Sequence, residues 1–166
     1  GVAWRRAAIS PQQQAELDAA MALVRARRYD QGLEALVQLA NRMPGHPVPL
    51  INQALVHKQL GRHELAQERL QQALRMDPDD PLAANELALL YRQQGRFAEA
   101  RPVYERMLAL YPNFALGHKN LGVLCDLYLR DYECALCHYK RYSAFAPDDQ
   151  NVRIWIADLE KRVAAK

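Results

Sequence analysis

The chain has 166 residues, of which half are hydrophobic and a quarter are charged, and its formal net charge is +3. This length and apolar content suffice for one domain or one continuous array with a substantial core. The small, interspersed charge lacks the basic runs that bind nucleic acid or membrane surfaces. No apolar run reaches the roughly 20 residues that a transmembrane helix needs.

Residues 1–9, which include Trp4, fit no periodic pattern, and we interpret them as an N-terminal arm or linker. Helical signals begin at Ser10, which is followed by Pro11 and, three residues after Ser10, by Gln13. A capping hydroxyl with a glutamine three residues later is typical of a capping box at the start of a helix. The pattern predicts a single helical domain over residues 10–166.

The most regular stretch, residues 81–114, is predicted to form two amphipathic helices joined by a turn at Gly95. Apolar residues recur there at the spacing of one helix face; they are Leu87, Ala88, Tyr91, Phe97, Ala100, Tyr104 and Leu108. Counterparts lie at earlier steps of 34 residues, namely Gly61, Ala66, Leu74 and Pro78, then Tyr29, Gly32 and Pro44. Such a period predicts a repeat array, with repeats at about 13–46, 47–80, 81–114 and 115–149.

The first repeat matches the pattern weakly, with Ala19, Ala20 and Gly32 at variant positions, and the second and fourth repeats depart from it inside or just after their first helices. In the second repeat, Gln53 and His57 take the places of Leu87 and Tyr91, either as hydrogen-bonded core residues or as a local feature. In the fourth repeat, the distance from Pro112 to Pro147 is 35 residues instead of 34, and Leu129 or Arg130 stands where the turn glycine belongs. We expect one inserted residue between positions 126 and 131, with a longer first helix or a distorted turn.

A final helix is predicted over residues 150–164, after a cap at Asp148 or Asp149. Its apolar positions form one stripe, made by Val152, Trp155 or Ile156, Leu159 and Val163. Repeat arrays need a capping element with a polar outer face, and this helix fits that role. The acidic residues after the repeat prolines, Asp77, Asp79 and Asp80, are also interpreted as helix caps.

These residues resemble the tetratricopeptide repeat family, whose 34-residue pattern is filled here by Leu87, Ala88, Tyr91, Ala100, Tyr104 and Pro112. The resemblance implies an all-α, right-handed α-solenoid that holds other proteins, is rarely an enzyme and carries no cofactor. The excess of arginine over lysine is consistent with a GC-rich bacterial genome. Bacterial members of the family in envelope assemblies make a periplasmic or envelope location our expectation by analogy, with the cytoplasm left open.

In a tetratricopeptide stack the first helices of successive repeats line a concave groove. Transferring that arrangement by helical geometry predicts a groove lined by Leu17, Met21, Arg25, Ile51, Asn52, Leu55, Lys58, Leu82, Asn85, Glu86, Leu89, Arg92, Leu116, Lys119, Asn120 and Val123. Its apolar strip, asparagines and basic edge would suit an apolar peptide or helix with some acidic residues. The alternative is that the strip is buried within the array or covered by the N-terminal arm.

The fourth repeat contains C-x-x-C-H, formed by Cys134, Cys137 and His138. This motif attaches c-type haem, and with Cys125 it could supply zinc ligands. We favour buried free cysteines acting as small hydrophobic residues, or a Cys125–Cys134 disulfide if the protein is exported. His57 alone makes no catalytic constellation and is interpreted as a hydrogen-bonded core residue.

Together these patterns predict a non-catalytic scaffold or adaptor that binds a peptide or helical segment of a partner protein. One alternative is a self-associating structural unit whose groove is filled by its own arm or by a second copy. A more remote alternative is a haem or zinc protein built on Cys134, Cys137 and His138.

Overall fold

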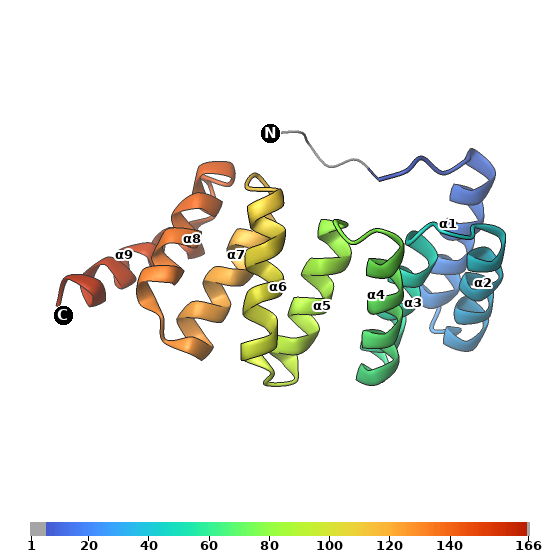
Figure 1. Ribbon diagram of the computed structural model, residues 1–166, viewed down its shortest axis with the longest axis horizontal. Helices are drawn as coiled ribbons and strands as arrows, with labels where there is room; N and C mark the ends of the chain where they lie inside the picture. Colours follow the sequence, from blue (N-terminus) through green and yellow to red (C-terminus); the bar gives the residue numbers. More distant parts are fainter. Residues whose placement is uncertain (1–5, 166) are drawn as a thin grey trace. The chain divides into compact units, whose positions relative to one another are not determined.

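The computed structural model describes residues 6–165, and the regular secondary structure of this part of the chain is helical, without a strand (Figure 1). The helices are α1 (Pro11–Arg25), α2 (Tyr29–Arg42), α3 (Val48–Gln59), α4 (His63–Met76), α5 (Pro81–Gln93), α6 (Phe97–Leu110), α7 (Ala115–Val123), the π-helix η1 (Leu124–Leu129), α8 (Tyr132–Phe145) and α9 (Gln150–Ala164). The predicted all-α class is confirmed. In the described residues no helix combines the length and hydropathy that crossing a membrane requires.

The chain divides into two compact units, one ending at Leu90 and the other beginning at Tyr91. In the N-terminal unit, α1 pairs with α2, α3 pairs with α4, and α2 packs on α3. Its core includes a cluster of Ala20, Val24 and Leu36 with Val56 of α3. The residues predicted to form one face of each helix therefore meet across the helix pairs.

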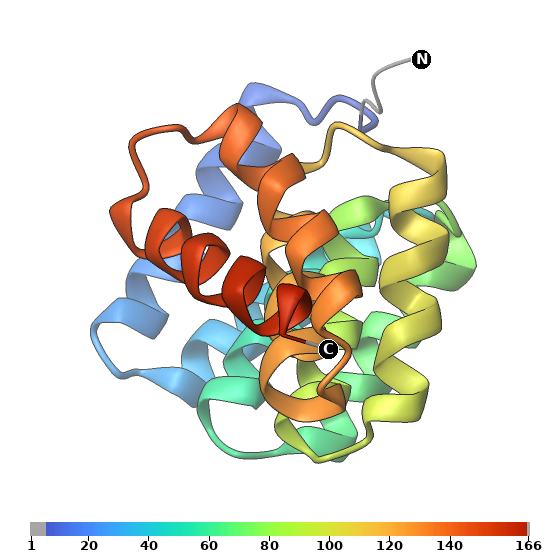
Figure 2. The same ribbon diagram turned by 90° about the vertical axis from the view of Figure 1, so that its left-hand side faces the viewer.

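In the C-terminal unit, α7 pairs with α8, and α9 packs on α8 as a last layer (Figure 2). Val152 and Leu159 of α9 are buried, as the predicted stripe requires. Gly122 of α7 lies directly against the Tyr139 ring of α8, and a Cβ at this position would approach ring atoms to 2.5 Å. Only glycine permits this close contact, because a new methyl group would have to displace a fully packed aromatic ring.

Each helix pair is joined by a residue in the left-handed conformation, at steps of 34, 34 and 35 residues. Arg27, Gly61, Gly95 and Arg130 have φ of 60°, 71°, 74° and 54°. In the first three turns the next amide donates to the carbonyl five residues earlier, from Arg28 to Leu23, from Arg62 to His57 and from Arg96 to Tyr91. This is the hydrogen bond of a Schellman ending, in which a left-handed residue terminates the helix.

The irregularity predicted in the fourth repeat is confirmed, and the inserted residue takes the form of a π-helix. Residues 124–129 form η1, and the turn bond from Asp131 to Cys125 spans six residues instead of five. A π-turn accommodates one extra residue inside a helix. The insertion therefore leaves α8 in place, and its effect is confined to the side chains of η1 and to Arg130.

The predicted helix caps are confirmed at several positions. Ser10 and Gln13 form a complete capping box. The Asp80 carboxylate accepts hydrogen bonds from the amides of Leu82 and Ala83, and that of Asp149 accepts one from Val152. These carboxylates satisfy amides at helix starts that have no partner within the helix.

The segment before α1 contacts the N-terminal unit. Arg6 donates to both carboxylate oxygens of the buried Asp80, at 2.9 and 3.2 Å, and the carbonyl of Ala7 lies 3.0 Å from Nε2 of His46. These contacts place residues 6 and 7 beside the loops that precede α3 and α5. The rest of the predicted arm, residues 1–5 with Trp4, lies outside the described residues.

Replacing Arg27 by glycine should raise the free energy of unfolding by up to about 1 kcal/mol. A left-handed residue with a side chain costs about 1–2 kcal/mol, and the greater freedom of glycine in the unfolded chain cancels about 0.5–1 kcal/mol of that gain. Gly61→Arg, in the equivalent turn, should lower stability instead. Urea unfolding followed by circular dichroism measures both changes, and a destabilised Arg27→Gly variant would contradict the turn geometry.

Candidate functional site

The structure places the predicted groove residues of the N-terminal unit at very different depths. Leu17, Met21, Leu55 and Leu89 are half-buried, and Arg25 is exposed. Leu82 has 37% of its surface exposed, whereas Ile51 has only 5%. Ile51 is wrong as a groove residue, because it packs into a core cluster with Leu50, Ala73 and Ala83.

The predicted polar residues of the same unit mostly have partners within the fold. The Asn52 amide donates to the carbonyl of Val48 in its own helix, at 2.9 Å, and Lys58 forms an ion pair of 2.9 Å with Glu86. Asn85 is buried. The interpretation of Asn85 as an asparagine that meets a peptide backbone is therefore wrong, and Lys58 could reach an acidic ligand only by leaving Glu86.

In the C-terminal unit, Leu116 is 47% exposed, while Arg92, Lys119, Asn120 and Val123 are half-buried. Lys119 donates to Asp149 at 2.8 Å, and the Tyr142 hydroxyl donates to the same carboxylate at 3.0 Å. This network raises the pKa of Lys119, mainly through the bond to Asp149. Lys119 thus helps to hold the start of α9 as well as lying at a predicted groove position.

One position of the repeat stays accessible throughout. Met21, Leu55, Leu89 and Val123 follow one another at steps of 34 residues, lie on α1, α3, α5 and α7, and are all half-buried. The first helix of each repeat thus keeps an apolar side chain that packing within the fold does not fully cover.

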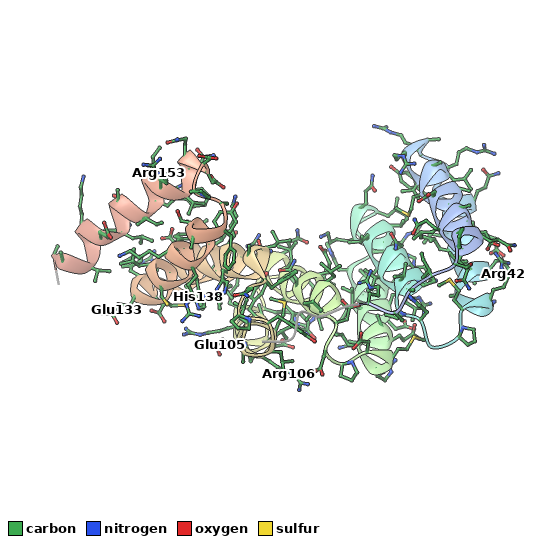
Figure 3. All side chains as sticks on the ribbon, turned by 90° about the horizontal axis from the view of Figure 1, so that it is seen from above. Arg42, Glu105, Arg106, Glu133, His138 and Arg153 are labelled. Atoms are coloured by element: carbon green, nitrogen blue, oxygen red, sulfur yellow. A yellow bond between two sulfur atoms is a disulfide. The ribbon has the colours of Figure 1, made fainter. Side chains whose placement is uncertain are left out.

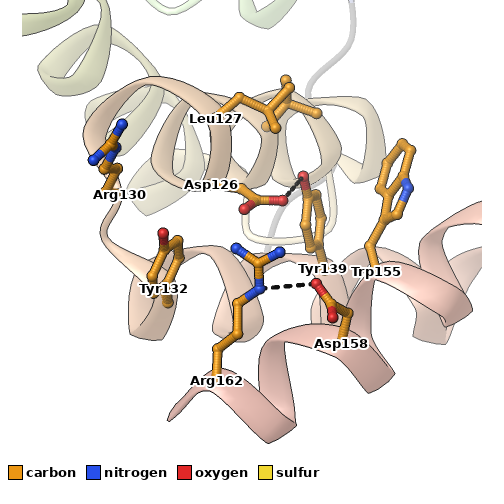
Figure 4. Close-up of a pocket in the computed structure, with 9 residues that line it drawn as sticks. Asp126, Leu127, Arg130, Tyr132, Tyr139, Trp155, Asp158 and Arg162 are labelled. Carbon is orange, nitrogen blue, oxygen red and sulfur yellow. Dashed lines mark hydrogen bonds and ion pairs between the residues drawn. The ribbon is translucent and has the colours of Figure 1, made fainter. Parts of the chain in front are cut away.

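A hollow of about 500 Å³ lies in the C-terminal unit among the end of α7, η1, α8 and α9 (Figure 4). We call it the C-terminal hollow. Its lining combines apolar, aromatic and oppositely charged side chains: Val123, Asp126, Leu127, Arg130, Tyr132, Tyr139, Trp155, Asp158 and Arg162. A volume of about 500 Å³ falls within the range of ligand-binding clefts.

The charged groups in the C-terminal hollow have different partners (Figure 4). Arg162 donates to Asp158 at 2.9 Å and its guanidinium lies 5.7 Å from the centre of the Tyr132 ring. Asp126 accepts from the Tyr139 hydroxyl at 3.3 Å. Burial, and secondarily the Asp126 charge, raises the pKa of Tyr139 far above its ordinary value, so Tyr139 acts only as a neutral donor.

Sequence reasoning found only part of this hollow. Val123 was predicted from its repeat position, and the disturbance near Asp126 was predicted from the insertion. The stripe of the last helix is predicted to use Trp155 or Ile156, and the Trp155 ring lies beside Tyr139, 5.4 Å between centroids, where it lines the hollow. The i, i+4 spacing of Asp158 and Arg162 on one helix face was the available signal for the remaining wall.

Two of the three cysteines are joined in a disulfide. Cys125 of η1 is bonded to Cys134 of α8, with their Cα atoms 5.9 Å apart, while Cys137 is a free, exposed thiol. The interpretation of all three as buried free thiols is therefore wrong. The structure contains the Cys125–Cys134 bond that we expected only for an exported protein.

The disulfide also bears on the haem and zinc interpretations. The Cys134 sulfur is bonded to the Cys125 sulfur. Cys134 therefore offers neither a thiol for haem attachment nor a thiolate for zinc. In residues 6–165 no cluster of three or more His, Cys, Asp or Glu side chains has an arrangement suited to a metal ion. His138, the last residue of the motif, instead contacts another histidine.

His118 and His138 form a direct contact between α7 and α8. Nε2 of His118 lies 2.7 Å from the carbonyl of Pro112, and the two Nδ1 atoms lie 2.9 Å apart. A carbonyl can only accept, so Nε2 of His118 carries the proton and Nδ1 of His118 accepts from Nδ1 of His138. Both imidazoles are neutral in this arrangement.

Burial is the main cause of a lowered pKa in both histidines. It lowers the pKa of His118. It lowers that of His138 to about 4, with further lowering by His118 and Arg141 and by Arg101, and a partial opposing effect of Glu105 on α6 (Figure 3). A protonated His138 would place a charge beside a buried imidazole, which explains the direction.

His57 occupies a core position, as predicted, but without the expected set of hydrogen bonds. It is buried, and its Nδ1 atom has no hydrogen-bond partner. Burial lowers the pKa of His57, and the nearby Arg62 and Arg69 lower it further. The ring therefore behaves as a neutral packing group.

Comparison with known proteins supports the fold. Residues 51–113 match the sequence model described as tetratricopeptide repeat, and no curated protein matches the chain. Among solved structures, MamA from Desulfovibrio magneticus RS-1 shares 17% identity over 95% of this chain and 88% of that chain, with a TM-score of 0.75.

Two further structures extend this likeness. A tetratricopeptide repeat protein from Parabacteroides merdae ATCC 43184 shares 18% identity, covering 94% of this chain and 62% of that chain, with a TM-score of 0.77. A chain of the APC/C hetero-tetramer Cut9-Hcn1 shares 24% identity over 90% of this chain and 30% of that chain, with a TM-score of 0.74. These similarities show a common α-solenoid fold.

Alkylation should distinguish the cysteines. Under denaturing but non-reducing conditions, iodoacetamide should modify one cysteine, Cys137, and after reduction it should modify all three. Replacing Cys125 and Cys134 together by alanine should lower the free energy of unfolding by about 3 kcal/mol, because a closed loop restricts the unfolded chain. Cys137→Ala is the control. Three modified cysteines before reduction would contradict the disulfide.

Acid should destabilise the C-terminal unit through the histidine pair. The unfolded chain binds a proton on His138 below its ordinary pKa of 6.5, whereas the folded chain does so only near 4. The contribution of His138 to the free energy of unfolding is therefore fully present above about pH 6.5. It is lost as the pH falls from 6.5 to 4, and its size is on the order of 3 kcal/mol.

The variant His138→Asn tests this explanation. Asparagine can keep an N–H donor for His118 but does not titrate in this range. Urea unfolding of the wild type and the variant at several pH values should show a shallower pH dependence in the variant. An unchanged slope would assign the acid sensitivity to other groups.

Proposed function

We propose that this chain, a tetratricopeptide repeat protein, is a non-catalytic scaffold or adaptor that binds a peptide or helical segment of a partner protein along the first helices of its repeats. The observation that carries the proposal is the accessible apolar position repeated at Met21, Leu55, Leu89 and Val123. The fold itself is typical of scaffolds for protein–protein interaction.

Packing within the fold accounts for only part of the apolar surface at that position. Met21 packs against the core cluster of Ala20, Val24, Leu36 and Val56, yet it stays half-buried, as Leu55, Leu89 and Val123 do. Accessible apolar surface of this kind commonly marks interaction surfaces. Leu82 and Leu116 add exposed apolar area one turn or more away on α5 and α7. A partner segment would gain about 25 cal/mol for each Å² of apolar surface that it covers.

The charges near these residues support a partner with mixed character. Arg25 is exposed, but Lys58 is paired with Glu86 and Lys119 with Asp149. An acidic ligand would have to replace those internal partners, so acidic residues on the ligand would contribute selectivity more than affinity. Apolar contact is the main source of binding energy in this proposal.

An oxidising compartment is part of the proposal. The Cys125–Cys134 disulfide supports it, because such bonds persist in the periplasm and in secreted proteins and are rare in the cytosol. We therefore place the protein in a bacterial envelope complex as a working hypothesis. Loss of the disulfide in protein purified from its native compartment under thiol-blocking conditions would reject this location.

Charge substitution on the first helices should abolish partner capture. Leu55→Asp and Leu82→Asp would place carboxylates on the proposed surface, whereas Leu65→Asp on α4 is a control of matched exposure, 38% against 37% for Leu82. Affinity capture from an extract of the source organism, quantified by mass spectrometry, should show partners lost with the first two variants and retained with the third.

Light scattering at several protein concentrations distinguishes self-association from the binding of a different protein. A mass that rises with concentration in the wild type and not in Leu55→Asp would show that a second copy fills the surface. Equal capture by all three variants and the wild type would reject the surface as the binding site.

A further inference from the structure

We propose that the C-terminal hollow is an anchor site for a partner segment that carries a bulky apolar side chain with a basic residue on one side and an acidic residue on the other. This inference rests on the proposed scaffold function and assigns a specific contact to it. The anchor side chain would enter between η1 and α9, and the two charged neighbours would meet Asp126 and Arg130 at the rim (Figure 4).

The apolar part of the site is formed by side chains from three elements. Leu127 of η1 is 65% exposed, and it lines the same hollow as Trp155 of α9 and Tyr139 of α8. Packing within the unit does not cover Leu127. An aromatic or large aliphatic side chain placed in the hollow would contact both Leu127 and the aromatic rings, which is how anchor residues contribute most binding energy at interfaces.

The polar part of the site consists of two pairs of opposite charges, of which one forms a salt bridge and the other does not. Asp158 and Arg162 stand four residues apart on α9 and form a salt bridge. Asp126 and Arg130 have the same order and the same spacing, but neither forms an ion pair with any described residue. The Arg130 guanidinium, and the Asp126 carboxylate apart from its hydrogen bond with the Tyr139 hydroxyl, are therefore available to a ligand.

The inserted residue explains why the second pair forms no salt bridge. Residues four apart face each other on an α-helix, but Asp126 lies in the π-helix and Arg130 has a left-handed backbone. The wider π-turn and the reversed backbone turn Arg130 away from Asp126. The same irregularity that adds a residue to the repeat thus leaves these two opposite charges unpaired with each other.

The disulfide fixes the two walls of the site relative to each other. Cys125 immediately precedes Asp126, and Cys134 follows Tyr132 by two residues on α8. The η1 wall and the α8 wall are therefore covalently joined next to the residues that line the hollow. A pre-formed site loses less conformational entropy on binding than a mobile one.

Selection from a random peptide display library on the oxidised wild-type protein tests the proposal. The selected peptides should share an aromatic or large aliphatic residue flanked by Lys or Arg on one side and Asp or Glu on the other. The double variant Asp126→Lys, Arg130→Glu should bind these peptides at least about tenfold more weakly, a loss expected when charges in a contact are reversed. Leu127→Asp should weaken binding as strongly.

The control exchanges an ion pair outside the hollow. Lys140 and Glu160 join α8 and α9 at 2.7 Å, and the variant Lys140→Glu, Glu160→Lys reverses two charges without changing net charge. It should retain wild-type affinity. Circular dichroism and the alkylation pattern of the cysteines show whether each variant is folded.

The results of these binding experiments distinguish failure of the anchor site from failure of the proposed scaffold function. Peptides that lose affinity in Leu55→Asp or Leu82→Asp but bind normally to the Asp126→Lys, Arg130→Glu variant would keep the proposed function and overturn the anchor site. A library that yields no enriched sequence, or one whose peptides lack the flanking charges, would also overturn it. Weak binding to the Asp126→Lys, Arg130→Glu variant supports the anchor site, whatever the affinity for Leu55→Asp and Leu82→Asp.

Discussion

The fold depends on how closely the second helix of each repeat approaches the first. The position that allows this approach is occupied by Gly32, Ala66, Ala100 and Ala135, and all four residues are buried. They follow each other at steps of 34, 34 and 35 residues. At Gly32 even a methyl group would meet Val24 at 2.7 Å. Because protein interiors are packed without spare volume, this one contact sets which faces of the helices are buried and which are left for other uses.

The turn and the close contact must keep the same register, and the fourth repeat shows how an extra residue is tolerated. If the insertion had shifted α8 along α7, the Gly122 and Tyr139 contact and the Ala135 position would both have been lost. The chain instead places the added residue in η1, before the turn at Arg130. The cost is a strained backbone at Arg130, and the consequence is that the first helix of the fourth repeat ends in π-helical instead of α-helical geometry.

Most of the helical architecture could be predicted from sequence, because it follows from periodicity. A period of 34, glycine at the turns and aspartate before the helices each reflect a local requirement of the backbone. The single added residue was visible as a change from 34 to 35 between prolines. Its π-helical form was not, because a longer helix, a distorted turn and a π-turn all absorb one residue and differ only in tertiary packing.

Side-chain depth was harder to predict than helix position. Ile51 and Leu55 both lie on the predicted groove side of α3, yet Ile51 belongs to a cluster with α4 and α5 residues and Leu55 remains half-buried. The two residues differ by about 40° around the helix. Assigning positions from another repeat by the 34-residue step cannot distinguish so small a difference in direction. The choice between Trp155 and Ile156 for the stripe of the last helix was likewise left open by sequence; Ile156 is half-buried, whereas Trp155 has 36% of its surface exposed.

The disulfide could be predicted only conditionally, because oxidation depends on the compartment as well as on geometry. Once formed, it links the irregular segment to the regular one. Cys125 lies within η1 and Cys134 lies in the first turn of α8, so the segment with the least regular backbone is tied to a helix held by the repeat packing. Irregular segments have fewer internal hydrogen bonds and open more readily. The covalent link therefore gives η1 the rigidity that a binding wall needs and that its own backbone geometry does not supply.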